Sequence, residues 1–262
     1  MRRVFGSGSS HKGSAAMAVE AGAQGVSAAG DPATPPPGAA SPTTAGGEEL
    51  RLRRPRDATG EQIDRRLIQM FALVEEAVAG ATHALLAGDR EAARALVASD
   101  AALDDIYLEL DALVQDRVVE GGLTLGETRW LLTVLAMLPE LERSGDLAEH
   151  VAQRATRNLP SEIPVKSRGY IEAMGELACR MWRMAADSYA ERLESSEDID
   201  ALDDEMDDLH VEFIAELVSG TVPLPAAVEL ALIGRFYERL GDHAVNLARR
   251  MPSGSPRHRH RS

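Results

Sequence analysis

Paired acidic residues occur in this chain at a spacing that suits metal binding. Asp100 and Asp104 are four residues apart, and so are Glu142 and Asp146. Residues four apart share one face of a helix, and neighbouring helices pack about 8–10 Å apart. Two such pairs on facing helices would gather four carboxylates, which repel one another unless a hard cation such as Mg²⁺, Mn²⁺ or iron neutralises them. The two pairs therefore predict a carboxylate metal site.

The same pattern occurs a second time along the chain. Residues 99–114 align without a gap on residues 202–217, and Glu142-Arg143-Ser144-Gly145-Asp146 aligns on Glu238-Arg239-Leu240-Gly241-Asp242. A glycine inside a helix costs about 1 kcal/mol relative to alanine, so close helix approach or access of a ligand should offset Gly145 and Gly241. The repeat predicts two metal sites of the same composition, with the ligands Asp100, Asp104, Glu142, Asp146, Asp203, Asp207, Glu238 and Asp242.

The segment between the matched pairs is longer in the first repeat. Asp104 and Glu142 are 38 residues apart, whereas Asp207 and Glu238 are 31 apart. The surplus divides into four residues on one arm and three on the other, about one helical turn each, which keeps the acidic faces in register. Pro139 lies inside the first of these segments, and we expect it to kink its helix.

Helical periodicity covers the chain between its two ends. Apolar residues recur at helical spacing, and two sequences, 59–62 and 124–127, fit the capping box that opens a helix. Glycine or proline residues that favour helix ends or connections interrupt this periodicity at 88, 121–122, 160, 164 and 220. The expected helices cover 59–87, about 89–120, 124–158, 165–193, 195–219 and 223–251.

The fold class predicted is all-α: a six-helix bundle of two tandem three-helix repeats with disordered N- and C-terminal tails. The low-complexity tail spans 1–58, the first repeat 59–160, the second repeat 161–251, and a basic tail 252–262. Residues 1–47 are rich in Ala, Gly, Ser and Pro, so they cannot bury enough apolar surface to fold.

Composition excludes several classes of protein. The net charge is −14, and residues 51–251 carry −16 of charge against +2 for the remainder, which argues against a nucleic-acid binder. The single cysteine, Cys179, excludes an intramolecular disulfide and a multi-cysteine metal site. We see no secretory signal and expect no membrane span. Cys179, Trp130 and Trp182 lie in apolar helical stripes and are expected in the core, while Arg143 and Arg239 would pair with acids or contact an anion.

The duplicated Glu-Arg-x-Gly-Asp, each preceded by an Asp-x-x-x-Asp helix, resembles the PhoU family of phosphate-transport regulators. The resemblance covers about residues 59–251. It implies a two-repeat, six-helix bundle that binds metal ions and acts without catalysis. It also implies a cytoplasmic regulator, often a homodimer, that associates peripherally with membrane partners. Those partners would be the ATPase subunit of the phosphate ABC transporter and a phosphate-sensing histidine kinase, and the effect would be repression of the phosphate-starvation response.

The residues leave the metal open among Mg, Mn, Fe and Zn, as divalent or trivalent ions. Two other functions stay open at this point. One is a carboxylate-bridged metal enzyme in a helical bundle; no histidine recurs at matched positions, which disfavours a ferritin-type oxidase. The other is a structural helical module whose acidic faces serve solubility.

Overall fold

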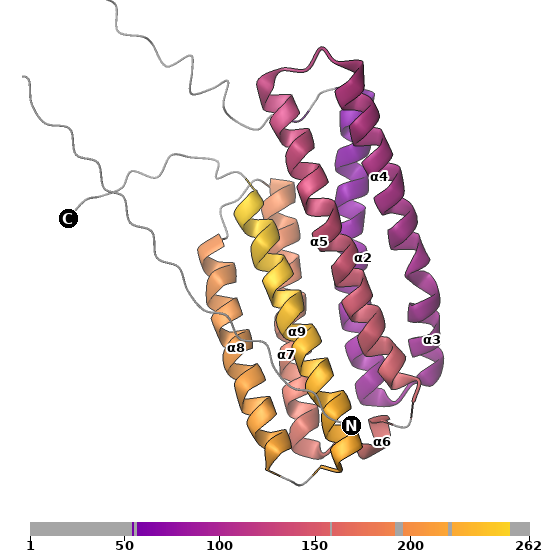
Figure 1. The fold of residues 1–262 in the computed structure, drawn as a ribbon, viewed down its shortest axis with the longest axis vertical. Helices are drawn as coiled ribbons and strands as arrows, with labels where there is room; N and C mark the ends of the chain where they lie inside the picture. The colour runs from indigo at the N-terminus through magenta and orange to yellow at the C-terminus, as the bar shows by residue number, and fades with distance from the viewer. Residues whose placement is uncertain (1–53, 55–56, 158, 192–195, 220–221, 252–262) are drawn as a thin grey trace, which may run out of the picture. The chain divides into compact units, whose positions relative to one another are not determined.

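The structure, a computed structural model, describes residue 54 and residues 57–157, 159–191, 196–219 and 222–251. These residues are helical with no strand among them, which confirms the all-α fold class. Six helices in this part of the chain have 20 or more residues, and two are shorter (Figure 1). The helices are α2 (Ala58–Ala87), α3 (Arg90–Ser99), α4 (Ala101–Glu120), α5 (Leu125–Ala155), α6 (Leu159–Glu162), α7 (Val165–Glu191), α8 (Ser196–Val218) and α9 (Leu224–Arg250).

Short-range signals set most helix ends. The capping box expected at Thr124 is present, with Thr124 and Glu127 each satisfying the other's backbone N–H. The box expected at Thr59 is wrong, because α2 starts earlier: Asp57 is its N-cap and accepts a 2.7 Å hydrogen bond from the Gly60 N–H. Gly88 ends α2 with φ 69°, a left-handed conformation that glycine adopts without strain.

The helix expected over 89–120 is two helices, α3 and α4, that meet at Asp100. The Asp100 carbonyl accepts from the Leu103 N–H at 2.9 Å and from the Asp104 N–H at a longer 3.4 Å, so the turn is tightened. The Ser99 hydroxyl donates to the Leu96 carbonyl at 2.8 Å. Short polar side chains compete in this way with the backbone hydrogen bonds of a helix. The break places Asp100 at the start of α4.

The third expected helix ends at Ala155, and the short α6 occupies the connection to the second repeat. α5 continues through Pro139. Proline cannot donate a backbone hydrogen bond and disturbs the preceding turn. In that turn the Ala136 carbonyl accepts a 2.7 Å hydrogen bond from the Arg250 guanidinium of α9.

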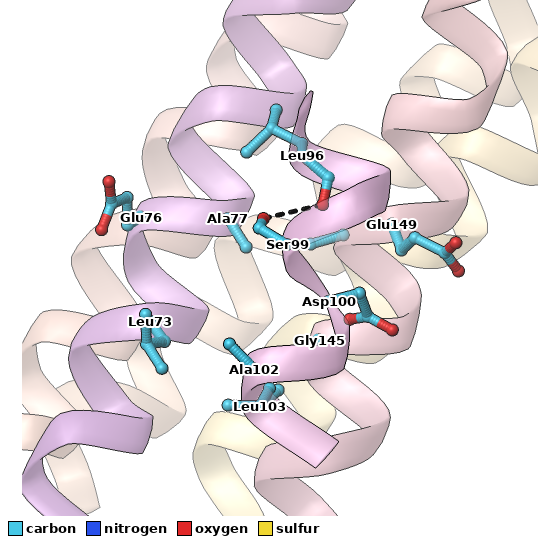
Figure 2. Close-up of a pocket in the computed structure, with 11 residues that line it drawn as sticks. Leu73, Glu76, Ala77, Leu96, Ser99, Asp100, Ala102, Leu103, Gly145 and Glu149 are labelled. Atoms are coloured by element: carbon cyan, nitrogen blue, oxygen red, sulfur yellow. Dashed lines mark hydrogen bonds between the residues drawn. The ribbon is translucent and has the colours of Figure 1, made fainter. Parts of the chain in front are cut away.

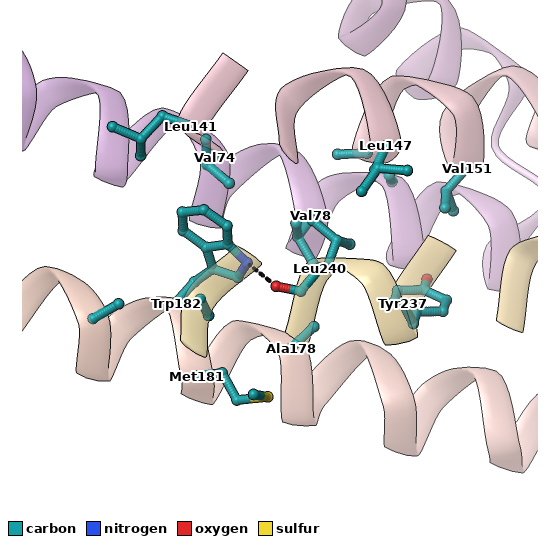
Figure 3. Close-up of a cluster of buried hydrophobic side chains, with 14 of the residues drawn as sticks. Val74, Val78, Leu141, Leu147, Val151, Ala178, Met181, Trp182, Tyr237 and Leu240 are labelled. Carbon is teal, nitrogen blue, oxygen red and sulfur yellow. Dashed lines mark hydrogen bonds between the residues drawn. The ribbon is translucent and has the colours of Figure 1, made fainter. Parts of the chain in front are cut away.

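The helices form two layers. One layer has the order α4, α5, α9, α8, and the other consists of α2 and α7 (Figure 1). α2 packs on α4, α5 and α7, while α7 packs on α8, α9 and α2. The core lies between the layers and includes Phe71, Trp182 and Phe213, each at most 1% exposed. Figure 3 shows the Trp182 indole N–H donating to the Leu240 carbonyl at 3.1 Å, which satisfies the one polar group of this side chain.

The two repeats pack with opposite helix directions. Across α2 and α7, the Tyr189 hydroxyl donates to Asp64, whereas the Arg168 guanidinium contacts the Leu86 carbonyl. Low numbers on one helix thus meet high numbers on the other. α5 and α9 are also antiparallel, because Arg250 at the end of α9 contacts Ala136 in the first half of α5, and Arg154 at the end of α5 contacts Glu229 near the start of α9. This arrangement relates the two repeats by an approximate two-fold axis perpendicular to the helices.

α2 has the length and composition of a membrane-crossing helix, with a mean hydropathy of 1.3 in its most apolar window. It is the one such helix among the described residues, whereas the sequence pattern predicts none. Part of its apolar surface is buried against the neighbouring helices: Ile63, Leu67 and Val74 are 0% exposed, whereas Ile68 is 40% exposed. A core helix of a soluble bundle meets the same test, so this composition is weak support for a membrane span.

The tails expected over 1–58 and 252–262 lie outside the described residues except at three positions: Arg54, Asp57 and Ala58. Arg54 makes contacts with the bundle. Its guanidinium donates to Asp64 at 2.9 Å and to the Tyr189 carbonyl at 2.6 Å, and it lies 4.5 Å from the centre of the Tyr189 ring.

Candidate metal centre

Glycine and aspartate occupy matching positions in the two repeats, where α4 meets α5 and α8 meets α9. A Cβ atom added to Gly145 would lie 3.4 Å from Asp100 Oδ1, and one added to Gly241 would lie 3.0 Å from Asp203 Oδ1. Each aspartate therefore reaches the helix turn between the two acids of the facing helix. The added Cβ of Gly145 would also come within 2.2 Å of the Leu103 side chain. Close helix approach thus explains both glycines.

The first cluster of acids is electrostatically strained. Burial, followed by repulsion from Glu149, Asp104 and Asp146, raises the pKa of Asp100 from 3.8 to about 6. Burial is also the first cause that raises the pKa of Glu142 and Asp146, and Asp104 adds to both. The four predicted ligands of this repeat therefore act on one another.

The second cluster has the same character. Burial, followed by repulsion from Asp242 and Asp207, raises the pKa of Asp203 to about 6. Burial and Asp242 raise the pKa of Glu238. One Glu238 oxygen, Oε1, pairs with Arg235, while Oε2 is buried and has no hydrogen-bond partner. An unpaired buried carboxylate oxygen is costly and is a natural donor to a cation.

The donor chemistry fits a hard cation, because all eight predicted ligands offer carboxylate oxygens. As the side chains stand, no three acidic, histidine or cysteine residues in the described part of the chain lie close enough together to hold an ion. The role of the eight residues as ligands therefore stays a prediction. Asp104, Asp207 and Asp242 are exposed, so their side chains have room to turn toward the other acids.

The surroundings of the two clusters differ, and the repeat pattern did not reveal this. Glu149 and His150 act on the first cluster, whereas His210 and Arg235 act on the second. None of these four residues has a counterpart of its own type in the other repeat. Only their position one turn from a predicted ligand could have indicated them.

A cleft of about 160 Å³ opens beside the first cluster, at the break between α3 and α4. Its lining includes Asp100 and Gly145 together with the apolar side chains of Leu73, Leu96 and Leu103, all labelled in Figure 2. α8 has no break over its described residues, so the junction that forms this cleft has no counterpart there.

Matched arginines cross between α5 and α9 on either side of the two clusters. Arg250 donates to buried Glu140 at 2.9 Å, and His243 Nδ1 lies 2.6 Å from the other oxygen of Glu140. Arg154, the counterpart of Arg250, lies 4.7 Å from the Phe236 ring centre and 3.1 Å from Glu229. These contacts join α5 of the first repeat to α9 of the second.

Other expected residues take ordinary places. Trp130 and Trp182 are in the core, as expected. Cys179 is half-buried, and burial raises the pKa of its thiol to about 11, so the thiol stays protonated at neutral pH. Arg143 and Arg239 are exposed on the surface.

Comparison with known proteins identifies the family. The model of the PhoU domain matches twice, at residues 67–155 and 171–251, and each match includes one of the two Glu-Arg-x-Gly-Asp segments. The chain belongs to the PhoU family. Both repeats of the six-helix bundle are PhoU domains.

Curated PhoU relatives match over most of their length. The phosphate-specific transport system accessory protein PhoU homolog 2 of Mycobacterium tuberculosis is 32% identical over 202 residues, which cover 72% of this chain and 91% of the relative. The PhoU homolog of Rhizobium meliloti is 28% identical and is covered to 81%. The crystal structure of PhoU from Pseudomonas aeruginosa shares the fold, with a TM-score of 0.70 at 23% identity over 74% of this chain and 95% of that one.

Proposed function

We propose that this protein is an accessory regulator of a phosphate-specific transport system. The observation that carries the proposal is the match of the PhoU domain to both repeats, including both acidic motifs. The relatives in Mycobacterium tuberculosis and Rhizobium meliloti are named as accessory proteins of that system. The role is regulatory and not enzymatic, so binding and release of partners would transmit the signal.

In finer detail, the protein is an adaptor between the ATPase subunit of the phosphate transporter and a phosphate-sensing histidine kinase. It would repress the phosphate-starvation response when phosphate is sufficient. This role needs a cytoplasmic location on the inner face of the membrane, reached through the partners, and a homodimer is compatible with it. The excess of acid over 51–251 supports protein partners over nucleic acid.

Metal ions would complete the two acidic clusters and fix the hairpins α4–α5 and α8–α9. The ligands would be Asp100, Asp104, Glu142 and Asp146 in one cluster and Asp203, Asp207, Glu238 and Asp242 in the other. A bound Mg²⁺, Mn²⁺, iron or Zn²⁺ would supply positive charge that offsets the mutual repulsion of the carboxylates. The raised pKa values of Asp100 and Asp203 support this, since burial first and repulsion from neighbouring carboxylates second disfavour their charged forms.

Deletion of the gene tests the regulatory role. In phosphate-replete medium the deletion strain should express phosphate-starvation genes, and the wild-type chain supplied in trans should restore repression. Repression that persists without the chain would contradict the proposal. Pull-down from phosphate-replete cells, probed for the transporter ATPase and the sensor kinase, tests the adaptor role.

Metal analysis of the purified full chain tests the clusters. The chain loaded with Mn²⁺ or iron should retain metal after desalting, and Asp146→Asn combined with Asp242→Asn should release most of it. The control is Asp105→Asn combined with Asp208→Asn, which removes the same charge from matched exposed positions outside the clusters. Equal retention by both double variants would show that the clusters are not the ligands.

A further inference from the structure

Exposed apolar side chains recur in pairs on the two hairpins. Leu108 of α4 is 63% exposed, and Val211, its counterpart in α8, is 68% exposed. Val119 and Val218, each two residues before the glycine that follows its helix, are 85% and 79% exposed. Such side chains normally avoid water, and isolated cases need no explanation. Recurrence at matched positions does need one.

The start of each third helix continues the pattern. Leu125 and Leu224 open α5 and α9 and are 52% and 77% exposed. Leu132 and Val228, each ten residues before the Glu of the motif, are 55% and 52% exposed. We call these two groups the hairpin patches: Leu108, Val119, Leu125 and Leu132 form the first, and Val211, Val218, Leu224 and Val228 form the second.

Both hairpin patches lie on the four-helix layer. α5 and α9 are flanked by helices on both sides and covered by the second layer, so their exposed residues face away from α2 and α7. Because the repeats run in opposite directions, the C-terminal ends of α4 and α8 lie at opposite ends of this layer (Figure 1). An approximate two-fold axis between α5 and α9 therefore relates the patches.

The charges around the patches restrict what they can bind. Exposed acids outside the predicted ligand sets lie close in sequence to both groups: Asp105, Asp116 and Glu120 to the first, and Asp204, Asp208 and Glu212 to the second. The exposed cations Arg129 of α5 and Arg235 of α9 are fewer, and Arg235 pairs with Glu238. Acidic flanks repel an anionic membrane surface and nucleic acid. They attract a protein surface with basic residues around an apolar centre.

We propose that the two hairpin patches dock the two identical subunits of one two-fold symmetric protein, each subunit presenting an apolar segment flanked by basic residues. Matched patches related by a two-fold axis complement a partner with the same symmetry, in the way that isologous surfaces match in dimers. This inference rests on the proposed function and deepens it, because it specifies the symmetry and surface chemistry of the partner. Engagement of both patches at once would make binding bivalent.

Site-specific photo-crosslinking in phosphate-replete cells tests the symmetry. A benzophenone amino acid replaces Val119 in one full-length chain and Val218 in another. Ile68, an exposed apolar residue of α2 in the other layer, serves as the matched control. Mass spectrometry identifies the adducts. We expect both patch positions to label the same peptide of the same protein, and the control position not to label it. The inference would be overturned if the two patch positions labelled different proteins, or if they labelled lipid or a second copy of this chain. It would also be overturned if neither position gave an adduct.

A second measurement tests bivalence. Leu132→Asp in the first patch should lower the adduct yield several-fold at Val119 and also at Val218, because loss of one contact removes the avidity of the other. Ile68→Asp should change neither yield, and thermal unfolding checks that each variant is folded. An unchanged yield at Val218 in the Leu132 variant would contradict a single symmetric partner. The identity of the shared peptide separately tests the proposed function: a protein outside phosphate transport and sensing would refute that function and leave the symmetry inference standing.

Discussion

Two glycines of α7 should respond in opposite ways to the same substitution. A Cβ added to Gly175 would lie 2.5 Å from Thr82 Cγ2, 2.7 Å from its Oγ1 and 3.2 Å from its Cβ, all on α2 of the other repeat. A Cβ added to Gly169, six residues earlier in the same helix, would meet nothing within 4 Å. Alanine therefore adds only helix propensity at Gly169 but forces α2 and α7 apart at Gly175.

The magnitude follows from three contributions. Replacing a helical glycine with alanine stabilises by about 1 kcal/mol, which is the whole effect expected for Gly169→Ala. Overpacking at Gly175 costs about 1–3 kcal/mol. The clash also disturbs the hydroxyl of buried Thr82, which lies 2.7 Å from the hydroxyl of fully buried Tyr237, and the loss of that hydrogen bond costs about 1 kcal/mol more. Gly175→Ala should therefore destabilise by about 1–3 kcal/mol net.

Denaturant unfolding and thermal melting of the full chain measure both effects. A loss of about 2 kcal/mol would lower Tm by about 4–8 °C for a domain of this size, while Gly169→Ala should raise Tm slightly. Stabilisation by both variants to the same degree would refute the tight contact between α2 and α7 and, with it, the way the repeats are joined.

Further predictions concern the acidic clusters and the contacts beside them. Asp100 and Asp203 have folded-state pKa values of about 6, above the usual 3.8, so each binds a proton more tightly in the folded protein. Metal-free protein should therefore become more stable as the pH falls from 7 toward 5, and Asp100→Asn with Asp203→Asn should flatten that rise in a series of denaturant titrations. Glu140→Ala should destabilise by about 1–3 kcal/mol, because buried contacts to α9 are lost, and urea unfolding at neutral pH measures it. Gly241→Ala would crowd the Asp203 carboxylate at 3.0 Å and should weaken Mn²⁺ binding in calorimetry with little loss of stability, whereas unchanged affinity would separate Asp203 from the ligand set.

Local signals in the sequence determine most of the fold. Apolar periodicity and the flanking glycines and capping residues determine where α5, α7, α8 and α9 lie to within a few residues. The N-cap of α2 lies two residues before the predicted one, because both Asp57 and Thr59 are good N-caps and only the hydrogen bond to Gly60 distinguishes them. The sequence pattern does not predict the break between α3 and α4 at Asp100, because a helix can also continue through Ser99 and Asp100.

The internal repeat predicts which acids lie near one another, because aligned residues of two homologous repeats occupy equivalent positions in the fold. The sequence therefore pairs Asp100 with Glu142 and Asp146 without any structure. It could not pair Glu140 with His243 and Arg250, because these contacts join different repeats and follow no repeat pattern.

The sequence by itself determined the helices, the repeat and the acidic faces, because these depend on spacing within a few turns or on alignment of one repeat with the other. Only the tertiary structure decided that the repeats pack in opposite directions, that Gly175 meets Thr82, and that the matched residues Leu108 and Val211 stay exposed. The physical reason is that an apolar side chain favours burial wherever it lies in the sequence. Whether it is actually buried depends on which helices pack against its own helix, and only the tertiary structure gives that arrangement.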